Sequence, residues 1–289
     1  MKSMAQRLEA VAAAPRRLVY TAQFGDYDPV MPVLQPDADC QYVVLSDRPL
    51  RVPRPWRLQR VDVPVSRLDD RLKNRWCKLH ATQLFPGHSH SLYVDAHLQI
   101  IGSLEGLWEG FARSRAPVGF MPHPLSHSVA EEVERGLRFG RIDPDQYQNL
   151  WPRQRARHLA AGFPDDLGVF FNAFFLRDHR HPTTQKLEQV WWEDLLAGLT
   201  RDQVALPFAL WSTGTDPYRI PLDWTLSPYF RHWSHLPGTN RRGRVIRWFD
   251  SRQAVHPLYR WPIRLLRPIS TLRTVSTRRR GRPRRGGTL

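Results

Sequence analysis

Short β-rich runs that close on an aspartate are the feature that most constrains this fold. Residues 40–47 (CQYVVLSD) and 91–95 (SLYVD) are mostly apolar and end in a carboxylate. Residues 17–24 form a similar run, and Gly25 and two further acids follow it. We expect three strands with polar side chains at their carboxyl ends, as in an α/β sheet that binds a nucleotide at that edge.

Further strands and helices are predicted from the pattern of apolar and polar residues. The run at residues 56–63 is polar enough for a strand near a sheet edge, and residues 118–121 form another strand. The most apolar run spans residues 167–177, with Asn172 inside it. Helices are expected over residues 66–84, 103–113, from 128 onward, 143–162 with a break near Pro152, and 184–199.

The composition is that of a globular protein. The chain has 289 residues, of which 41% are hydrophobic, with 11 Trp, so a sizeable core is expected. Two cysteines exclude a disulfide framework and fit a reducing compartment. No apolar run reaches the roughly 18–20 residues that span a bilayer. These features predict a cytoplasmic protein with a leader (residues 1–16), one domain (17–262) and a tail (263–289).

Positive charge is concentrated in the tail. The formal net charge is +16, and residues 263–289 contain many arginines and no acid. Such a block stays disordered and attracts phosphates, so it predicts peripheral contact with an anionic membrane, at its inner face. Specific nucleic-acid binding is not favoured, because no array of base-stacking aromatics accompanies the arginines.

Asp95 and His97 are candidate metal ligands. Side chains at positions i and i+2 of an extended segment point the same way, so both could face one cation. A divalent metal such as Mg²⁺ or Mn²⁺ takes oxygen ligands and shares itself with phosphates, and imidazole suits Mn²⁺ better than Mg²⁺. The alternative is an aspartate that caps a turn, beside a solvated histidine.

Cationic and buried polar residues supply further candidates. Arg75 and Lys78 lie three apart on the helix over residues 66–84, so they share a face that binds a diphosphate or is simply solvated. Asn172 is either a structural bridge or a ligand contact, because a buried amide must be hydrogen-bonded. A charged turn, Thr200 to Gln203, lies between two apolar segments.

Together these pieces resemble a known family over residues 17 to 210. It is the glycosyltransferase-like family, formerly of unknown function, that includes plant proteins of seed mucilage and cell-wall synthesis and many bacterial members. The matching pieces are VYTAQFGDYD (19–28), Lys78 with LFP (84–86), SLYVD (91–95), His123 with Glu131-Glu132, Phe171-Asn172 with RDH (177–179), and WWE (191–193) with RDQ (201–203).

The resemblance implies a GT-A-like fold, a single α/β domain with a central mixed, mostly parallel sheet flanked by helices. It also implies a nucleotide-sugar donor, a glycan or glycolipid acceptor, and a divalent metal, Mn²⁺ or Mg²⁺, at Asp95. Base or ribose contacts would come from Thr21, Phe24, Asp26 and Tyr27. Sugar or acceptor contacts would come from His123, Asn172, Arg201, Asp202 and Gln203. His97 stands where a second acid would complete the usual acid-x-acid pair.

The expected reaction is transfer of a sugar to an acceptor hydroxyl. Loss of the diphosphate needs positive charge, which the metal, Arg75, Lys78 or Arg201 would supply, with Asp202 as general base in an inverting enzyme. His232 and His235 are weaker candidates for a late metal ligand. Two alternatives stay open: a metal-dependent hydrolase of a lipid amide, and a noncatalytic basic protein that binds nucleic acid or an anionic membrane.

Overall fold

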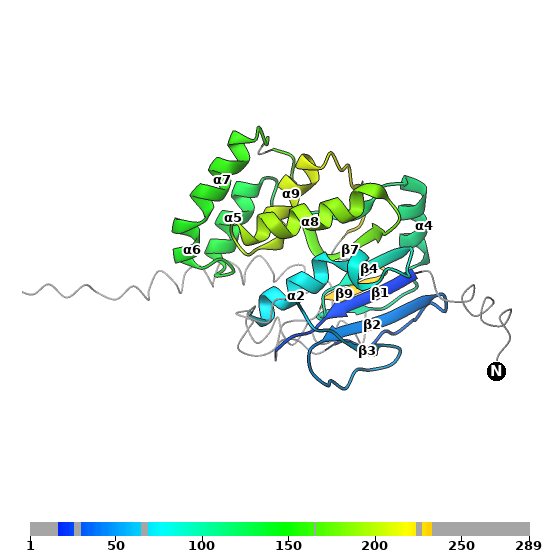
Figure 1. Ribbon diagram of the computed structural model, residues 1–289. Coiled ribbons are helices and arrows are strands. Elements are labelled where there is room, and N and C mark those ends of the chain that lie inside the picture. The colour runs from blue at the N-terminus through cyan, green and yellow to red at the C-terminus, as the bar shows by residue number, and fades with distance from the viewer. Residues whose placement is uncertain (1–16, 26–29, 65–68, 165, 224–226, 233–289) are drawn as a thin grey trace, which may run out of the picture.

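The centre of the molecule is a seven-stranded sheet in the order β3-β2-β1-β4-β7-β6-β8 (Figure 1). The computed structural model describes residues 17–25, 30–64, 69–164, 166–223 and 227–232. The strands of this sheet are β1 (Arg17–Ala22), β2 (Cys40–Ser46), β3 (Arg57–Arg60), β4 (His90–Val94), β6 (Val118–Pro122), β7 (Phe170–Asp178) and β8 (Tyr218–Arg219). A second sheet pairs β5 (Leu98–Ile100) with β9 (Phe230–His232).

Most strands of the large sheet run in one direction. Strands β1 to β4 are mutually parallel where they pair, and β6 is parallel to β8. Strand β7 is antiparallel to both of its neighbours, β4 and β6. The α/β class and the mixed, mostly parallel sheet are therefore confirmed, and β3 lies at an edge as its polar sequence predicted.

The helices match most of the expected ranges. They are α2 (Asp70–Leu79), α3 (Ala81–Leu84), α4 (Glu105–Ser114), α5 (Val129–Arg138), α6 (Pro144–Asn149), α7 (Trp151–Ala160), α8 (Pro182–Leu196) and α9 (Asp202–Ser212). Ser128 caps α5 by accepting a hydrogen bond from the Glu131 amide, and the break expected near Pro152 falls between α6 and α7. The leader, the Arg-rich tail and His235 lie outside the described residues.

Two hydrophobic clusters cover the two faces of the sheet, and a third lies beside it. The first packs α2, α8 and α9 on one face, and the second packs α4, β5 and β9 on the other. The third joins α5, α6 and α7 to α9 (Figure 1). None of the described helices has the length and apolar character that a bilayer crossing would need.

The helix predicted over residues 66–84 is broken at His80. In a continuous helix the Lys78 carbonyl would accept the Thr82 amide. Here that carbonyl accepts the Tyr20 hydroxyl and the Arg177 guanidinium, while the Thr82 amide and hydroxyl donate to the Glu188 carboxylate. The continuous helix was thus a wrong prediction, and side chains from β1, β7 and α8 replace its missing hydrogen bond.

Arg177 and Glu188 form a buried ion pair behind this break. The Arg177 Nε lies 3.0 Å from a Glu188 carboxylate oxygen, and both side chains are almost fully buried. Arg177 also donates to the Tyr20 hydroxyl at 2.7 Å. Removing one partner of such a pair strands a buried charge, whereas replacing both by apolar side chains costs far less.

We predict that Arg177→Met or Glu188→Leu alone lowers the free energy of unfolding by about 3–5 kcal/mol, and that the double variant loses less than either one. Denaturant unfolding measures this. The exposed pair Arg113–Glu109 is the control: Arg113→Met should lose under about 1 kcal/mol. Single variants as stable as the control would contradict this role for the buried pair.

Candidate functional site

The predicted site residues gather at one end of the sheet, where its parallel strands have their carboxyl ends; this end is called the sheet edge below. After β1 the chain pairs β2 on one side and later β4 on the other, so β1 and β4 border a switch point. In open α/β sheets, ligands bind outside the carboxyl ends of the strands at such a point. Asp95 follows β4 here, and its amide donates to the Ala173 carbonyl of β7 at 2.7 Å.

The antiparallel direction of β7 brings its beginning to the same edge. Met121 and Pro122, at the end of β6, pair with Phe171 and Phe170 at the start of β7. The register between these strands shifts beyond Phe120, and Asn172 lies in the irregular part. His123 comes directly after β6, so residues from β1, β4, β6 and β7 meet at one end of the sheet.

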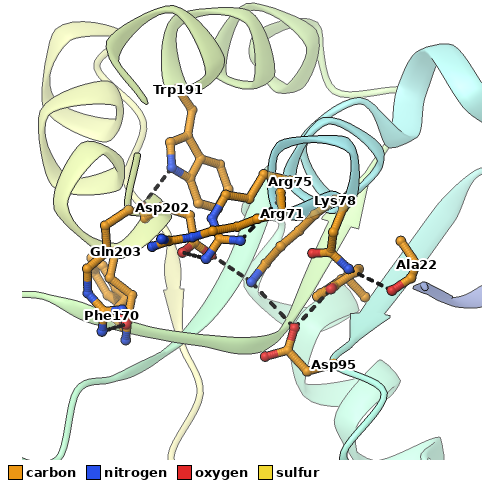
Figure 2. A network of polar contacts seen from close by, with 12 residues as sticks. Ala22, Arg71, Arg75, Lys78, Asp95, Phe170, Trp191, Asp202 and Gln203 are labelled. Carbon is orange, nitrogen blue, oxygen red and sulfur yellow. Dashed lines mark hydrogen bonds and ion pairs between the residues drawn. The ribbon is translucent and has the colours of Figure 1, made fainter. Parts of the chain in front are cut away.

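Lys78 is the centre of this arrangement (Figure 2). Its ammonium nitrogen lies 2.7 Å from Asp202 Oδ2 and 3.7 Å from Asp95 Oδ1. The Arg75 guanidinium approaches Asp202 Oδ1 at 3.7 Å, so Arg75 and Lys78 share one helix face as the sequence predicted. Lys78 is only 4% exposed, and it lies over the Tyr93 ring, 4.8 Å from the centroid.

Asp202 is the first residue of α9, although the sequence placed it in a turn. Burial acts to raise the pKa of its carboxyl, but Lys78 and Arg75 outweigh that effect and hold the pKa well below its usual range. The Asp202 carbonyl accepts the Trp191 indole N–H at 2.9 Å, which fixes the start of the helix. A buried carboxylate held by two cations is a poor proton acceptor. The geometry therefore favours a positioning role for Asp202 over the expected general base.

Of the two carboxylates that face Lys78, that of Asp95 is more accessible than that of Asp202. Its side chain is 27% exposed, and Oδ1 accepts the Tyr93 hydroxyl at 2.9 Å besides facing Lys78. Tyr93 and Lys78 both act on Oδ1, so the Asp95 carboxylate is oriented by them. This orientation suits a ligand that approaches the other oxygen.

The extended geometry expected for Asp95 and His97 was wrong. The Leu98 amide donates to the Asp95 carbonyl at 2.9 Å, which closes a tight turn over residues 95–98. The i and i+2 side chains of such a turn do not share a direction as they do in a strand. His97 instead packs edge-on against His232 of β9, with 4.9 Å between ring centroids.

Asp95 can supply one oxygen ligand to a divalent metal. In the part of the chain that the structure describes, no three His, Cys, Asp or Glu side chains are grouped as a metal site. A Mg²⁺ or Mn²⁺ ion held through one carboxylate would take its other ligands from a bound diphosphate and water, as Mg²⁺ commonly does. The single carboxylate fits that mode of binding, in which protein and substrate share the ion.

A second polar cluster centres on Glu132, which the sequence analysis named only as part of the matching piece Glu131-Glu132 and gave no role at the site. Glu132 is fully buried, and its carboxylate accepts the Arg201 Nε at 3.0 Å and the Ser126 hydroxyl at 2.9 Å. His123 Nε2 lies 3.8 Å away. Helix phase could have found Glu132, because Val129 and Gly136, each one turn away from it, are both buried.

Arg201 joins the two clusters. It precedes Asp202 at the start of α9, adds to the attraction that lowers the Asp202 pKa, and bonds the Gln203 side chain as well as Glu132. Gln203 in turn donates to the Phe170 carbonyl of β7. The predicted triplet of residues 201–203 therefore connects α5, α9 and β7 at the sheet edge.

Two predicted contact residues are buried without a hydrogen-bond partner among the described residues. Asn172 is 2% exposed, and neither its amide oxygen nor its nitrogen is bonded; the Thr21 hydroxyl, on a side chain 1% exposed, is also unbonded. Buried polar atoms of this kind are rare in folded proteins. The described chain thus offers no structural bridge for Asn172, which favours the ligand-contact interpretation.

The remaining predicted contacts lie on the β1 side. Phe24 is buried, and the Lys73 ammonium lies 6.0 Å from its ring centroid. Asp26 and Tyr27 fall outside the described residues. A separate cavity of about 620 Å³ lies at the other ends of the strands. It is lined by residues before β6 and β8 and residues after β7, and contains none of the predicted site residues.

Comparison with known proteins leaves the family resemblance as a prediction. No family model matches this sequence, and no curated protein matches it.

His123 generates a pH prediction. Burial lowers its pKa to about 4; Glu132 acts in the opposite direction, and Arg135 and Arg201 reinforce burial. An unfolded histidine titrates near 6.5, so between about pH 6.5 and 4 the unfolded state binds the extra proton. The stability contributed by neutral His123 is therefore complete above about pH 6.5 and is lost as the pH falls through about 4.

We predict that His123→Gln flattens the decline of unfolding free energy over this interval. At about 1.4 kcal/mol per pKa unit, the wild type should lose on the order of 3 kcal/mol more than the variant. Denaturant unfolding at several pH values measures it, with exposed His127→Gln as the control. Equal slopes for His123→Gln and wild type would contradict the low pKa.

Proposed function

We propose that this protein is a glycosyltransferase with a GT-A-like fold that moves a sugar from a nucleoside-diphosphate donor to an acceptor hydroxyl. The observation that carries the proposal is the buried Lys78, which lies at the β1–β4 switch point between the carboxylates of Asp95 and Asp202. Supporting it, Thr21 and Asn172 offer unbonded polar atoms at the same sheet edge. The family resemblance over residues 17 to 210 points to the same activity.

The chemistry asks for positive charge at the leaving group. When the bond between sugar and diphosphate breaks, negative charge develops on the diphosphate, and fixed cations stabilise it. Lys78 and Arg75 come from the same turn of α2, and Asp202 holds both in place. Because these charges are already oriented and partly withdrawn from water, they need little rearrangement during the reaction.

Asp95 has a separate role in this proposal. Its carboxylate would hold a divalent metal, which when bound supplies further positive charge to the diphosphate. The Tyr93 hydroxyl orients that carboxylate. Asp202 keeps Lys78 directed toward Asp95, so it acts as a positioning residue; its assignment as general base stays a prediction from the resemblance.

We predict that Asp95→Asn removes the divalent-metal dependence of nucleotide-sugar binding. A thermal-shift panel of nucleoside diphosphates and nucleotide sugars, with and without Mn²⁺, measures this. Wild type should gain roughly 2.7 kcal/mol of apparent stability at a hundredfold excess of ligand over its dissociation constant. Because the Asp95 side chain is partly exposed, the variant should fold normally. A wild type that no compound in the panel stabilises would sink the proposal.

Lys78→Met should reduce turnover by about 10²–10³-fold, the cost of removing one charge-stabilising group. Lys186→Met, the same change on an exposed face of α8, is the matched control and should turn over normally. Asp202→Asn separates the two roles of that residue. A positioning role predicts partial activity with an unchanged pH profile, whereas loss of the acidic limb of the profile, along which a general base loses its proton, would restore the general-base assignment.

A further inference from the structure

Arg135 of α5 is a half-buried cation that lacks a carboxylate partner among the described residues. Its guanidinium carbon lies 5.5 Å from the centroid of the Phe139 ring, and its Nε is buried without a hydrogen-bond partner. Glu132 attracts it at longer range, but the Glu132 carboxylate is already in contact with Arg201 and Ser126. A guanidinium in this state retains donors for an incoming anion.

The surroundings of Arg135 are themselves cationic. Burial lowers its pKa, and repulsion from Arg201 and Arg138 adds to that effect. Arg141, in the turn after α5, acts on His123 together with Arg135 and Arg201. Arg135 is therefore repelled by two neighbouring arginines, Arg201 and Arg138, and an anion bound to Arg135 would reduce that repulsion.

The position of Arg135 separates it from the cations at the switch point. Lys78 and Arg75 belong to α2 and pair with Asp202, whereas Arg135 belongs to α5, the helix that carries Glu132, and is close enough to His123 and Arg201 to interact with both electrostatically. Arginine presents a planar fork that matches phosphate and carboxylate geometry, so its type also suits anion recognition.

We propose that Arg135 binds an anionic group, a phosphate or a carboxylate, on the acceptor that receives the sugar. The identification of the ligand as an acceptor rests on the proposed transferase function, whereas the anion site rests on the contacts of Arg135 itself. The donor diphosphate lies against Lys78 and Arg75, and the acceptor enters from the α5 side with its negative group against Arg135. The acceptor is thus an acidic glycan or a phosphorylated carrier.

The test is anion binding by the full chain, with inorganic phosphate and glucuronate as probes and sodium chloride at matched ionic strength as the blank. Thermal shift and calorimetry compare wild type, Arg135→Gln, Arg135→Lys and the control Arg113→Gln, which changes an exposed arginine on α4. Wild type and Arg113→Gln should bind at least one probe equally well. Arg135→Gln should bind it at least tenfold more weakly, and Arg135→Lys should fall between them, because it keeps the charge and loses the fork.

The pattern identifies the source of the anion. Binding of phosphate alone indicates a phosphorylated acceptor, and binding of glucuronate alone indicates an acidic sugar. The inference is overturned if wild type binds neither probe at millimolar concentration, or if Arg135→Gln binds both as tightly as wild type.

A second arm separates this inference from the proposed function. The anion titration is repeated with a saturating nucleoside diphosphate. Additive binding supports two separate sites, whereas displacement of the anion together with weaker nucleotide binding by Arg135→Gln would place Arg135 in the donor site and refute the acceptor assignment. If no nucleoside diphosphate binds while the Arg135-dependent anion does, the transferase proposal fails and the anion site stands.

Discussion

The interruption of one helical hydrogen bond sets the direction of Lys78. Where the Lys78 carbonyl would meet the Thr82 amide, the Arg177–Glu188 ion pair takes both groups, and α2 ends. Burying this ion pair is costly unless every polar atom is bonded, and here the Tyr20 hydroxyl completes the network. The helix end is therefore tied to β1, β7 and α8 at once. The ammonium of Lys78, two residues before the break, is held at this end of the sheet by groups that lie in the core beneath it.

The same edge gathers polar residues that are far apart in the sequence. Asp95 follows β4, Asn172 lies near the start of β7, and Asp202 begins α9, yet all three lie at the same end of the sheet because β7 runs against its neighbours and α9 packs on the same sheet. Each strand end leaves backbone groups and side chains that the sheet itself does not use. The charged residues at this end of the sheet alternate in sign and neutralise one another: Lys78 lies between Asp95 and Asp202, and Arg201 lies between Asp202 and Glu132.

Local sequence patterns predicted most helices and strands, whereas contacts between distant segments decide where the helix over residues 66–84 breaks and where the chain turns after Asp95. The length and apolar content of the runs predicted β1, β2 and β4, the Ser128 cap located α5, and three-residue spacing placed Arg75 and Lys78 on one face. The break at His80 could not be read locally, because side chains from three other elements cause it. The turn after Asp95 was misread for a related reason: β5 turns away from the large sheet to pair with β9, so the chain cannot stay extended through His97. GT-A identity is a further step that the mixed sheet is compatible with and that stays part of the proposal.

The distribution of charge bears on the kind of catalysis that this site can support. Asp202 and Glu132 are buried carboxylates in contact with cations, and a carboxylate stabilised in this way gives up its capacity to accept a proton. What remains available is oriented positive charge, from Lys78 and Arg75 of α2 and from Arg135 of α5. A site built in this way stabilises negative charge as it develops instead of moving protons, and it favours substrates that bring negative charge with them. The proposed donor, from which a nucleoside diphosphate leaves, would meet that condition at α2, and the proposed anionic acceptor would meet it at α5.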